Sequence, residues 1–216
     1  MSHLIAVARW VVLLVALAGA TASASPESDA RNPGEVNALV LVCEFYGGNY
    51  HFFLDAMEHL GWDVTTVGVT PTVSRCFWGG PIVVDLLVSE VGDVSAYDCL
   101  VIPTARAWDE RSHEQLLESP EALQLVSDAV NQGLMVLAGC GATRVLAAAD
   151  VLQGIHVTGH SLYVDEYEAA GAIFVGNPVP PVVDGNIMTS VRCQYYIYQA
   201  FEIMAAAIDS IRAVTR

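Results

Sequence analysis

The feature that most constrains the fold of this chain is a regular alternation of apolar runs and helix-like segments over residues 37–149. The apolar runs are short enough for strands, the segments after them have helical spacing, and Gly or Pro separates the two. The expected strands are Asn37–Cys43, Asp63–Val69, Asp98–Pro103 and Leu134–Ala138, and the expected helices are Tyr50–Leu60, Pro120–Asn131 and Ala142–Ala149. This alternation predicts an α/β fold: a doubly wound, mostly parallel sheet with helices on both faces and ligand crevices at the carboxyl ends of the strands.

The C-terminal third has a different pattern. Short β-like segments are expected at Ala172–Val175, Val182–Val183 and Asn186–Thr189, with Asp184-Gly185 as a hairpin turn. An amphipathic helix over Gln194–Arg212 closes the chain.

The N-terminus has the pattern of a signal peptide. Arg9 precedes the apolar run Trp10–Ala18, and the small residues Ala22–Ala24 precede Ser25. Because the run is shorter than the roughly 20 residues of a membrane span, we expect cleavage and a secreted or periplasmic protein without membrane attachment. An uncleaved anchor is the alternative. The predicted division is a signal peptide (1–24), a flexible leader (25–36) and one domain (37–216).

The charge balance restricts the partners. Nine basic residues, all of them Arg, stand against 24 Asp and Glu, which gives a net charge of −15. Nucleic-acid backbones and anionic membranes require a basic face, so we expect neither as a partner. The acidic excess is typical of a well-solvated surface.

The five cysteines would all remain after cleavage and meet an oxidising compartment. Because five is odd, at least one thiol stays free or pairs between molecules. No CxxC spacing is present, and the HxxxH spacing of His156 and His160 falls on a strand-like segment, so we expect no metal site. Cys43, Cys140 and Cys193 should approach the carboxyl edge of the sheet, which permits a Cys43–Cys193 disulfide or a pair that consumes Cys140.

The segment Leu137–Thr143 carries the strongest chemical signal. Cys140 lies between a buried strand and a helix, and Gly139, Gly141 and Ala142 allow a sharp turn there. Such a nucleophile elbow exposes the sulfur, and the amino end of the helix lowers its pKa. The alternative is a buried cysteine before a glycine-rich turn.

The wider sequence resembles the PfpI/ThiJ superfamily, whose members are related to class I glutamine amidotransferases and have a flavodoxin-like fold. The resemblance spans about Asn37 to Ile211. It is carried by Ala38-Leu-Val-Leu-Val42, Tyr97-Asp-Cys-Leu-Val-Ile-Pro103, Ala138-Gly-Cys-Gly-Ala142, Val157-Thr-Gly-His160 and Asp184-Gly-Asn-Ile-Met-Thr-Ser190.

The resemblance implies that Cys140 is the reactive cysteine and that His160 is its base. Gly141 stands where many members have a His, and Thr104-Ala105 stands where they have the Gly-Gly of the oxyanion pocket.

The first-helix Glu of the family is missing at Gly47-Gly-Asn-Tyr50. Glu44 lies a few residues too early, although a shifted loop could bring it back, so it is kept as a candidate substrate-binding residue together with Thr104, Ala105 and Arg192. Arg192 could hold a substrate carboxylate or lower the thiol pKa. We expect His51, His59 and His113 to be solvated. The acidic residues Asp165, Glu166 and Glu168 are expected to form a solvent-exposed loop.

Two hypotheses of function follow. The first is a cysteine hydrolase or amidase-like enzyme acting on a small carbonyl or amide compound, with Cys140 as nucleophile, Gly141 N–H and a backbone N–H near Thr104 or Ala105 as oxyanion donors, and His160 as proton shuttle. The second is a non-catalytic module that binds a small molecule or responds to oxidation. No cofactor is expected. The resemblance also allows a homodimer.

Overall fold

The computed structural model describes residues 36–74, 79–105, 112–176, 181–191 and 193–215. The predicted signal peptide, the leader up to residue 35, Cys76, Arg192 and the side chain of Cys193 lie outside the described part. Among the described helices, none has both the length and the apolar composition that a membrane crossing requires.

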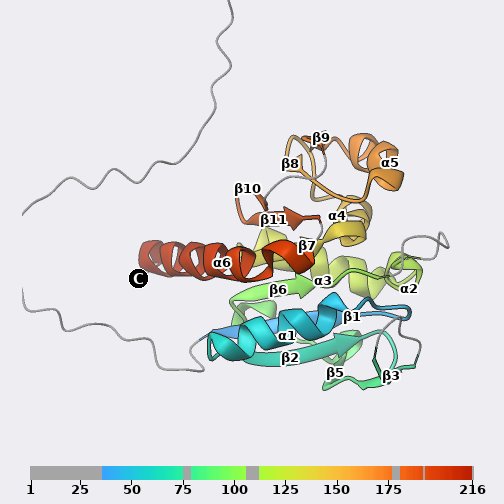
Figure 1. Cartoon of the computed structure of the whole chain (residues 1–216), viewed down its shortest axis with the longest axis vertical. Coiled ribbons are helices and arrows are strands. Elements are labelled where there is room, and N and C mark those ends of the chain that lie inside the picture. The colour runs from blue at the N-terminus through green and yellow to red at the C-terminus, as the bar shows by residue number, and fades with distance from the viewer. Residues whose placement is uncertain (1–35, 75–78, 106–111, 177–180, 192, 216) are drawn as a thin grey trace, which may run out of the picture. The chain divides into compact units, whose positions relative to one another are not determined.

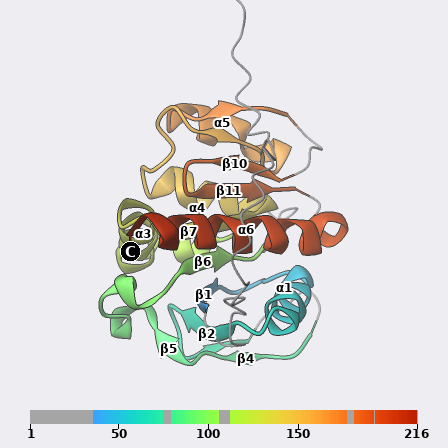
Figure 2. The ribbon, with the colours of Figure 1, turned by 90° about the vertical axis from the view of Figure 1, so that its left-hand side faces the viewer.

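The centre of the domain is a seven-stranded sheet with the order β10-β11-β7-β6-β1-β2-β5 (Figure 2). Its strands are β1 (Asn37–Val42), β2 (Asp63–Gly68), β5 (Leu86–Leu87), β6 (Cys99–Ile102), β7 (Met135–Gly139), β10 (Val182–Asp184) and β11 (Ile187–Ser190). All neighbours pair in parallel except β10 and β11, which form the antiparallel hairpin predicted from Asp184-Gly185. The predicted doubly wound sheet is therefore confirmed.

Two small sheets accompany the large one. The strands β3 (Thr72–Val73) and β4 (Ile82–Val83) are antiparallel, and β8 (His156–Val157) pairs in parallel with β9 (Ile173–Phe174).

Helices cover both faces of the large sheet (Figure 1). They are α1 (Asn49–His59), α2 (Glu114–Leu117), α3 (Pro120–Asn131), α4 (Thr143–Ala148), α5 (Val164–Ala169) and α6 (Cys193–Thr215). The side chains of β1 alternate between the two sides: Leu39 and Leu41 pack in the core with α3 and α4, whereas Ala38 and Val40 pack in the core with α1 and α6. Period-two alternation of an entirely apolar strand thus builds two cores.

Local signals explain where α3 begins and ends. The hydroxyl of Ser119 accepts a hydrogen bond from the N–H of Ala122 at 3.2 Å, and Pro120 occupies the first turn. Gly133 follows the helix with φ +83°, a conformation that favours glycine. The acidic residues expected in a loop instead lie on α5, where Tyr167 anchors the helix in the core.

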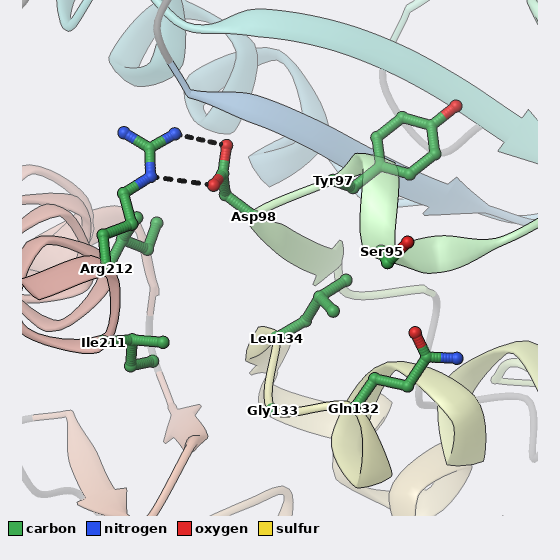
Figure 3. A pocket seen from close by; sticks show the side chains of 9 residues that line it. Ser95, Tyr97, Asp98, Gln132, Gly133, Leu134, Ile211 and Arg212 are labelled. Atoms are coloured by element: carbon green, nitrogen blue, oxygen red, sulfur yellow. Dashed lines mark hydrogen bonds and ion pairs between the residues drawn. The ribbon is translucent and has the colours of Figure 1, made fainter. Parts of the chain in front are cut away.

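A pocket at the amino-terminal edge of the sheet is lined in part by an ion pair (Figure 3). Asp98, just before β6, accepts hydrogen bonds from Arg212 of α6, with Nε–Oδ1 at 2.9 Å and Nη2–Oδ2 at 2.7 Å. The same carboxylate accepts the N–H of Asn37 at 2.8 Å. This pair fastens the final helix to the edge of the sheet opposite to the carboxyl ends of the strands.

Candidate active site

Cys140 lies in a sharp turn at the carboxyl end of strand β7. Its backbone φ is +55°, in the left-handed region that non-glycine residues rarely adopt. A 3-10 turn over Cys140–Ala142 leads directly into α4. Cys140 is half-buried. The backbone thus has the strand–turn–helix geometry of a nucleophile elbow.

The residue after the cysteine must be small because other side chains fill the space beside it. A Cβ atom on Gly141 would lie 2.9 Å from Ser112 Oγ, 3.5 Å from the ring of Tyr163 and 3.6 Å from His113 Cε1. A separation of 2.9 Å is shorter than carbon–oxygen contacts allow, so any larger residue at position 141 would displace Ser112.

Ser112 and His113 form a fully buried hydrogen-bonded pair behind the elbow. His113 Nε2 lies 3.0 Å from the carbonyl oxygen of Pro103, which can only accept, so Nε2 carries the proton. Nδ1 is then the acceptor for the Ser112 hydroxyl at 2.8 Å. Burial lowers the pKa of His113 to about 4, so the ring is neutral at pH 7. The expectation that His113 is solvated is wrong, whereas His51 and His59 are exposed as predicted.

Arg144 of α4 connects this pair to α5. Its Nη1 donates to the carbonyl oxygen of Ser112 at 2.8 Å, and its Nε donates to Glu166 Oε2 at 2.7 Å. The guanidinium carbon also lies 4.2 Å from the centre of the Tyr163 ring, in cation–π geometry. These contacts hold the elbow helix in place from outside.

His160 is brought next to Cys140 through the backbone. The His160 N–H donates to the carbonyl oxygen of Cys140 at 3.4 Å, in the loop after β8. Its Nδ1 accepts the N–H of Leu162 at 3.2 Å, which places the proton of the neutral ring on Nε2. Partial burial lowers the pKa of His160 and favours this neutral form. In this arrangement Nε2 is a hydrogen-bond donor, and a proton shuttle through Nδ1 requires the bond to Leu162 to break.

Thr104 and Ala105 also lie at the elbow. Thr104 Oγ1 donates to the carbonyl oxygen of Gly139 at 3.1 Å, and its own carbonyl accepts the N–H of Gly47 at 2.8 Å. Ala105 forms an isolated bridge with Tyr46. The segments after β1, β6 and β7 therefore meet at one edge, as expected for parallel strands.

Glu44 directs its carboxylate toward the β3 segment. Its Oε1 accepts the N–H and the hydroxyl of Ser74, each at 3.1 Å, while its backbone N–H donates to Gln115. Glu44 is thus held by partners of its own at the end of β1.

The other described cysteines are buried. Cys43 is 3% exposed, and burial raises the pKa of its thiol to about 12. Cys99 is fully buried at the start of β6, far along the strand from the carboxyl edge, and burial also raises its pKa. Cys43 is a free thiol, so the Cys43–Cys193 disulfide that the sequence permits is not formed in this structure.

His156 forms a pair with an acid and does not join His160. Its Nδ1 lies 2.8 Å from Asp184 Oδ2, which joins β8 to β10. Within the described ranges, no group of three or more His, Cys, Asp or Glu side chains is arranged to hold a metal ion.

Comparison with models of protein families identifies the family of this chain. The profile of the DJ-1/PfpI family matches residues 38–206, well over half of the 216 residues. The chain belongs to the DJ-1/PfpI family.

Curated proteins are similar to this chain over different lengths. An uncharacterised protein of Methanocaldococcus jannaschii is 26% identical over 204 residues, which cover 92% of this chain and 96% of that protein. Protein DJ-1 homolog D of Arabidopsis thaliana is 35% identical over 101 residues, which cover 45% of this chain. The chain spans only 24% of that longer relative.

Solved structures agree on the fold. Drosophila melanogaster DJ-1beta superposes with a TM-score of 0.64 at 20% identity, covering 83% of this chain and 97% of that one. The putative protease I from Bacteroides thetaiotaomicron gives a TM-score of 0.67 at 17% identity, covering 80% and 99%. At these identities the similarity establishes the flavodoxin-like fold of the DJ-1/PfpI family and nothing further.

Sequence reasoning missed three residues that support the elbow in this DJ-1/PfpI member: Ser112, His113 and Arg144. Ser112 and His113 lie just before a short helix and have no apolar periodicity around them. The one available signal was Gly141 itself, because a glycine directly after a candidate nucleophile indicates that something else occupies the space of its side chain.

Proposed function

We propose that this protein uses the thiol of Cys140 as a nucleophile toward a small carbonyl or amide compound. The positive φ of Cys140 carries the proposal. A non-glycine residue in this region costs of order 1 kcal/mol or more, and such strain is concentrated at functional sites. A half-buried thiol at this turn, at the edge of the sheet where ligands bind in this fold class, supports a role in chemistry.

The proposed reaction is hydrolysis through a thioester. The Cys140 thiol loses its proton to water, and the thiolate attacks the carbonyl carbon while the carbonyl electrons move onto oxygen. Gly141 N–H and a backbone N–H near Thr104 or Ala105 hold the oxyanion. The C–N bond then breaks, the amine leaves with a proton from water, and a second water hydrolyses the thioester. An amide and water thus give an acid and an amine.

In this proposal His160 acts as a neutral hydrogen-bond donor. With Nδ1 engaged by Leu162, the Nε2–H can stabilise negative charge at the elbow. Because burial lowers the pKa of His160, we expect the site to work best above the pH at which this ring becomes protonated.

A second candidate is a binding or redox-responsive module without hydrolysis. The carboxylate of Glu44 is engaged by Ser74, and Gly141 provides no side chain that could act as a base. Both observations favour a site that binds or is oxidised at sulfur without turning over.

We also propose, from the N-terminal sequence pattern, that the protein acts outside the cytoplasm, secreted or periplasmic. A small molecule is the proposed partner in either case. A homodimer remains a proposal drawn from the family.

The test is alkylation of the native protein with iodoacetamide from pH 5 to 10, with each site mapped by mass spectrometry. We expect Cys140 to react with a midpoint below the ordinary thiol value of about 8.5. Cys43 and Cys99 serve as buried internal controls, and Cys140→Ser removes the reactive site. A midpoint at or above that of a free thiol would contradict the hydrolase and leave the binding module. Release of ammonia from small amides, abolished by Cys140→Ser, separates the hydrolase from the binding module.

A further inference from the structure

The side-chain amide of Asn49, the first residue of α1, is buried without a hydrogen-bond partner. Asn49 is 8% exposed. Over the described part of the chain, neither its Oδ1 nor its Nδ2 forms a hydrogen bond. Burying an unsatisfied polar group is costly, and most such groups in folded proteins have partners. The amide therefore needs an explanation outside the fold itself.

The amide lies beside the segments that form the elbow. Asn49 Oδ1 is 3.3 Å from the point where a Cβ on Gly47 would lie, and Thr104 Cγ2 is 2.8 Å from that same point. Gly47 donates its N–H to Thr104, and Thr104 Oγ1 donates to the carbonyl oxygen of Gly139. Asn49 thus lies beside Gly47, and two consecutive hydrogen bonds connect Gly47 through Thr104 to Gly139, the residue before Cys140.

The amino end of α1 adds donors at the same place. Gly48 precedes the helix and makes no side-chain cap, and the first turn contains no acidic residue. The first N–H groups of a helix and its positive dipole end favour an oxygen ligand. This helix has 11 residues, long enough for a substantial dipole.

We propose that Asn49 recognises a primary carboxamide on a small ligand bound beside Cys140. A carboxamide presents a C=O acceptor next to an N–H donor, so it pairs with both Nδ2–H and Oδ1 of Asn49. A carboxylate only accepts and would leave Oδ1 unpaired. The inference rests on the proposed function and specifies its substrate class as primary amides.

A ligand reaches the covered amide through a local rearrangement. The preceding segment contains Phe45 with φ +65° and two glycines, Gly47 and Gly48. The strained residue and the two glycines make this segment the proposed place of that rearrangement.

The test compares iodoacetamide, which carries a primary carboxamide, with iodoacetate, which carries a carboxylate, as alkylating agents for Cys140. The rate ratio is measured for the wild type, for Asn49→Leu and for the matched control Asn131→Leu, an exposed asparagine of α3. All three proteins have the same charge, so the electrostatic repulsion of iodoacetate is the same in each. We expect Asn49→Leu to lower the preference for iodoacetamide roughly tenfold and the control to leave it unchanged.

The melting temperature gives a second readout. Asn49→Leu should raise it, whereas the same substitution should lower the preference for iodoacetamide. Because Leu removes an unsatisfied buried polar group and keeps the same branched heavy-atom skeleton, Asn49→Leu should raise the melting temperature by about 2–4 °C, and Asn131→Leu should not. An unchanged alkylation ratio, or a lower melting temperature of Asn49→Leu, would overturn the inference. The second result would show that the amide has a structural partner.

A thiol-independent measurement keeps this inference separate from the proposed chemistry. In the Cys140→Ser protein, benzamide should raise the melting temperature while benzoate does not, and Asn49→Leu should abolish the benzamide effect. If Cys140 is unreactive in the wild type but this shift is present, the nucleophile proposal fails and the carboxamide site stands. If the shift is absent although Cys140 reacts, the carboxamide site fails alone.

Discussion

Acid should destabilise this protein through one buried ring, that of His113. The perturbation is a fall in pH from 7 to 4, applied to the wild type and to His113→Gln. Gln is neutral over this range, and its amide can still donate to Pro103 and accept from Ser112. The two proteins thus differ mainly in the proton that His113 must take up on unfolding.

The magnitude follows from the pKa of His113, which burial lowers from 6.5 to about 4. Below pH 6.5 the unfolded chain binds a proton that the folded chain still excludes, so stability is complete above pH 6.5 and is lost as the pH falls toward 4. At about 1.4 kcal/mol per pH unit, the loss reaches about 3 kcal/mol. This is a large fraction of the stability of an ordinary domain.

The assay is urea unfolding of both proteins at half-unit steps between pH 7 and pH 4. The carboxylates and the other histidines titrate in both proteins, so the difference between their unfolding free energies isolates His113. We expect this difference to shift by about 3 kcal/mol in favour of His113→Gln as the pH falls. A difference that stays constant across the range would refute the assignment of His113 as a buried, neutral ring.

Three further predictions concern packing, the terminal helix and the buried thiols. Gly141→Ala should lower the free energy of unfolding by about 1–3 kcal/mol because the added Cβ meets Ser112. Adding Ser112→Gly should restore part of this loss. If the two substitutions lower the free energy of unfolding additively in urea, the prediction is contradicted. Arg212→Gln should lower stability by about 1 kcal/mol through loss of the paired bonds to Asp98, and 1 M NaCl should narrow its difference from the wild type. Cys43 should resist alkylation at pH 8 in the native state and react in urea. Burial raises the pKa of its thiol to about 12 and keeps the alkylating agent from reaching it. Alkylation of the native protein at the rate of the unfolded chain would contradict this.

Much of the fold could be predicted because its signals are local. The apolar run that forms β7 and the glycines around Cys140 predict a strand that turns sharply into a helix, and the positive φ of Cys140 agrees with that turn. Ser119 and Pro120 likewise predict the start of α3 from their own chemistry. Such signals act through the backbone of neighbouring residues, so they are readable without knowledge of distant contacts.

The surroundings of the cysteine could not be predicted, because they come from contacts between segments far apart in the chain. His113 has a polar sequence context that is typical of a solvated loop, yet it is fully buried beside Gly141. Asp184 lies 28 residues from its partner His156. No periodic pattern of apolar residues indicates which loops meet at the edge of a sheet.

By itself the sequence determined the alternation of strands and helices, the two apolar faces of β1 and the position of the elbow, because burial and backbone conformation act within a few residues. Only the tertiary structure decided that His113 is buried and neutral, that His160 presents Nε2–H, and that the amide of Asn49 is left unpaired. These states depend on which groups are excluded from water together, and that exclusion exists only after the strands have assembled and their loops have met.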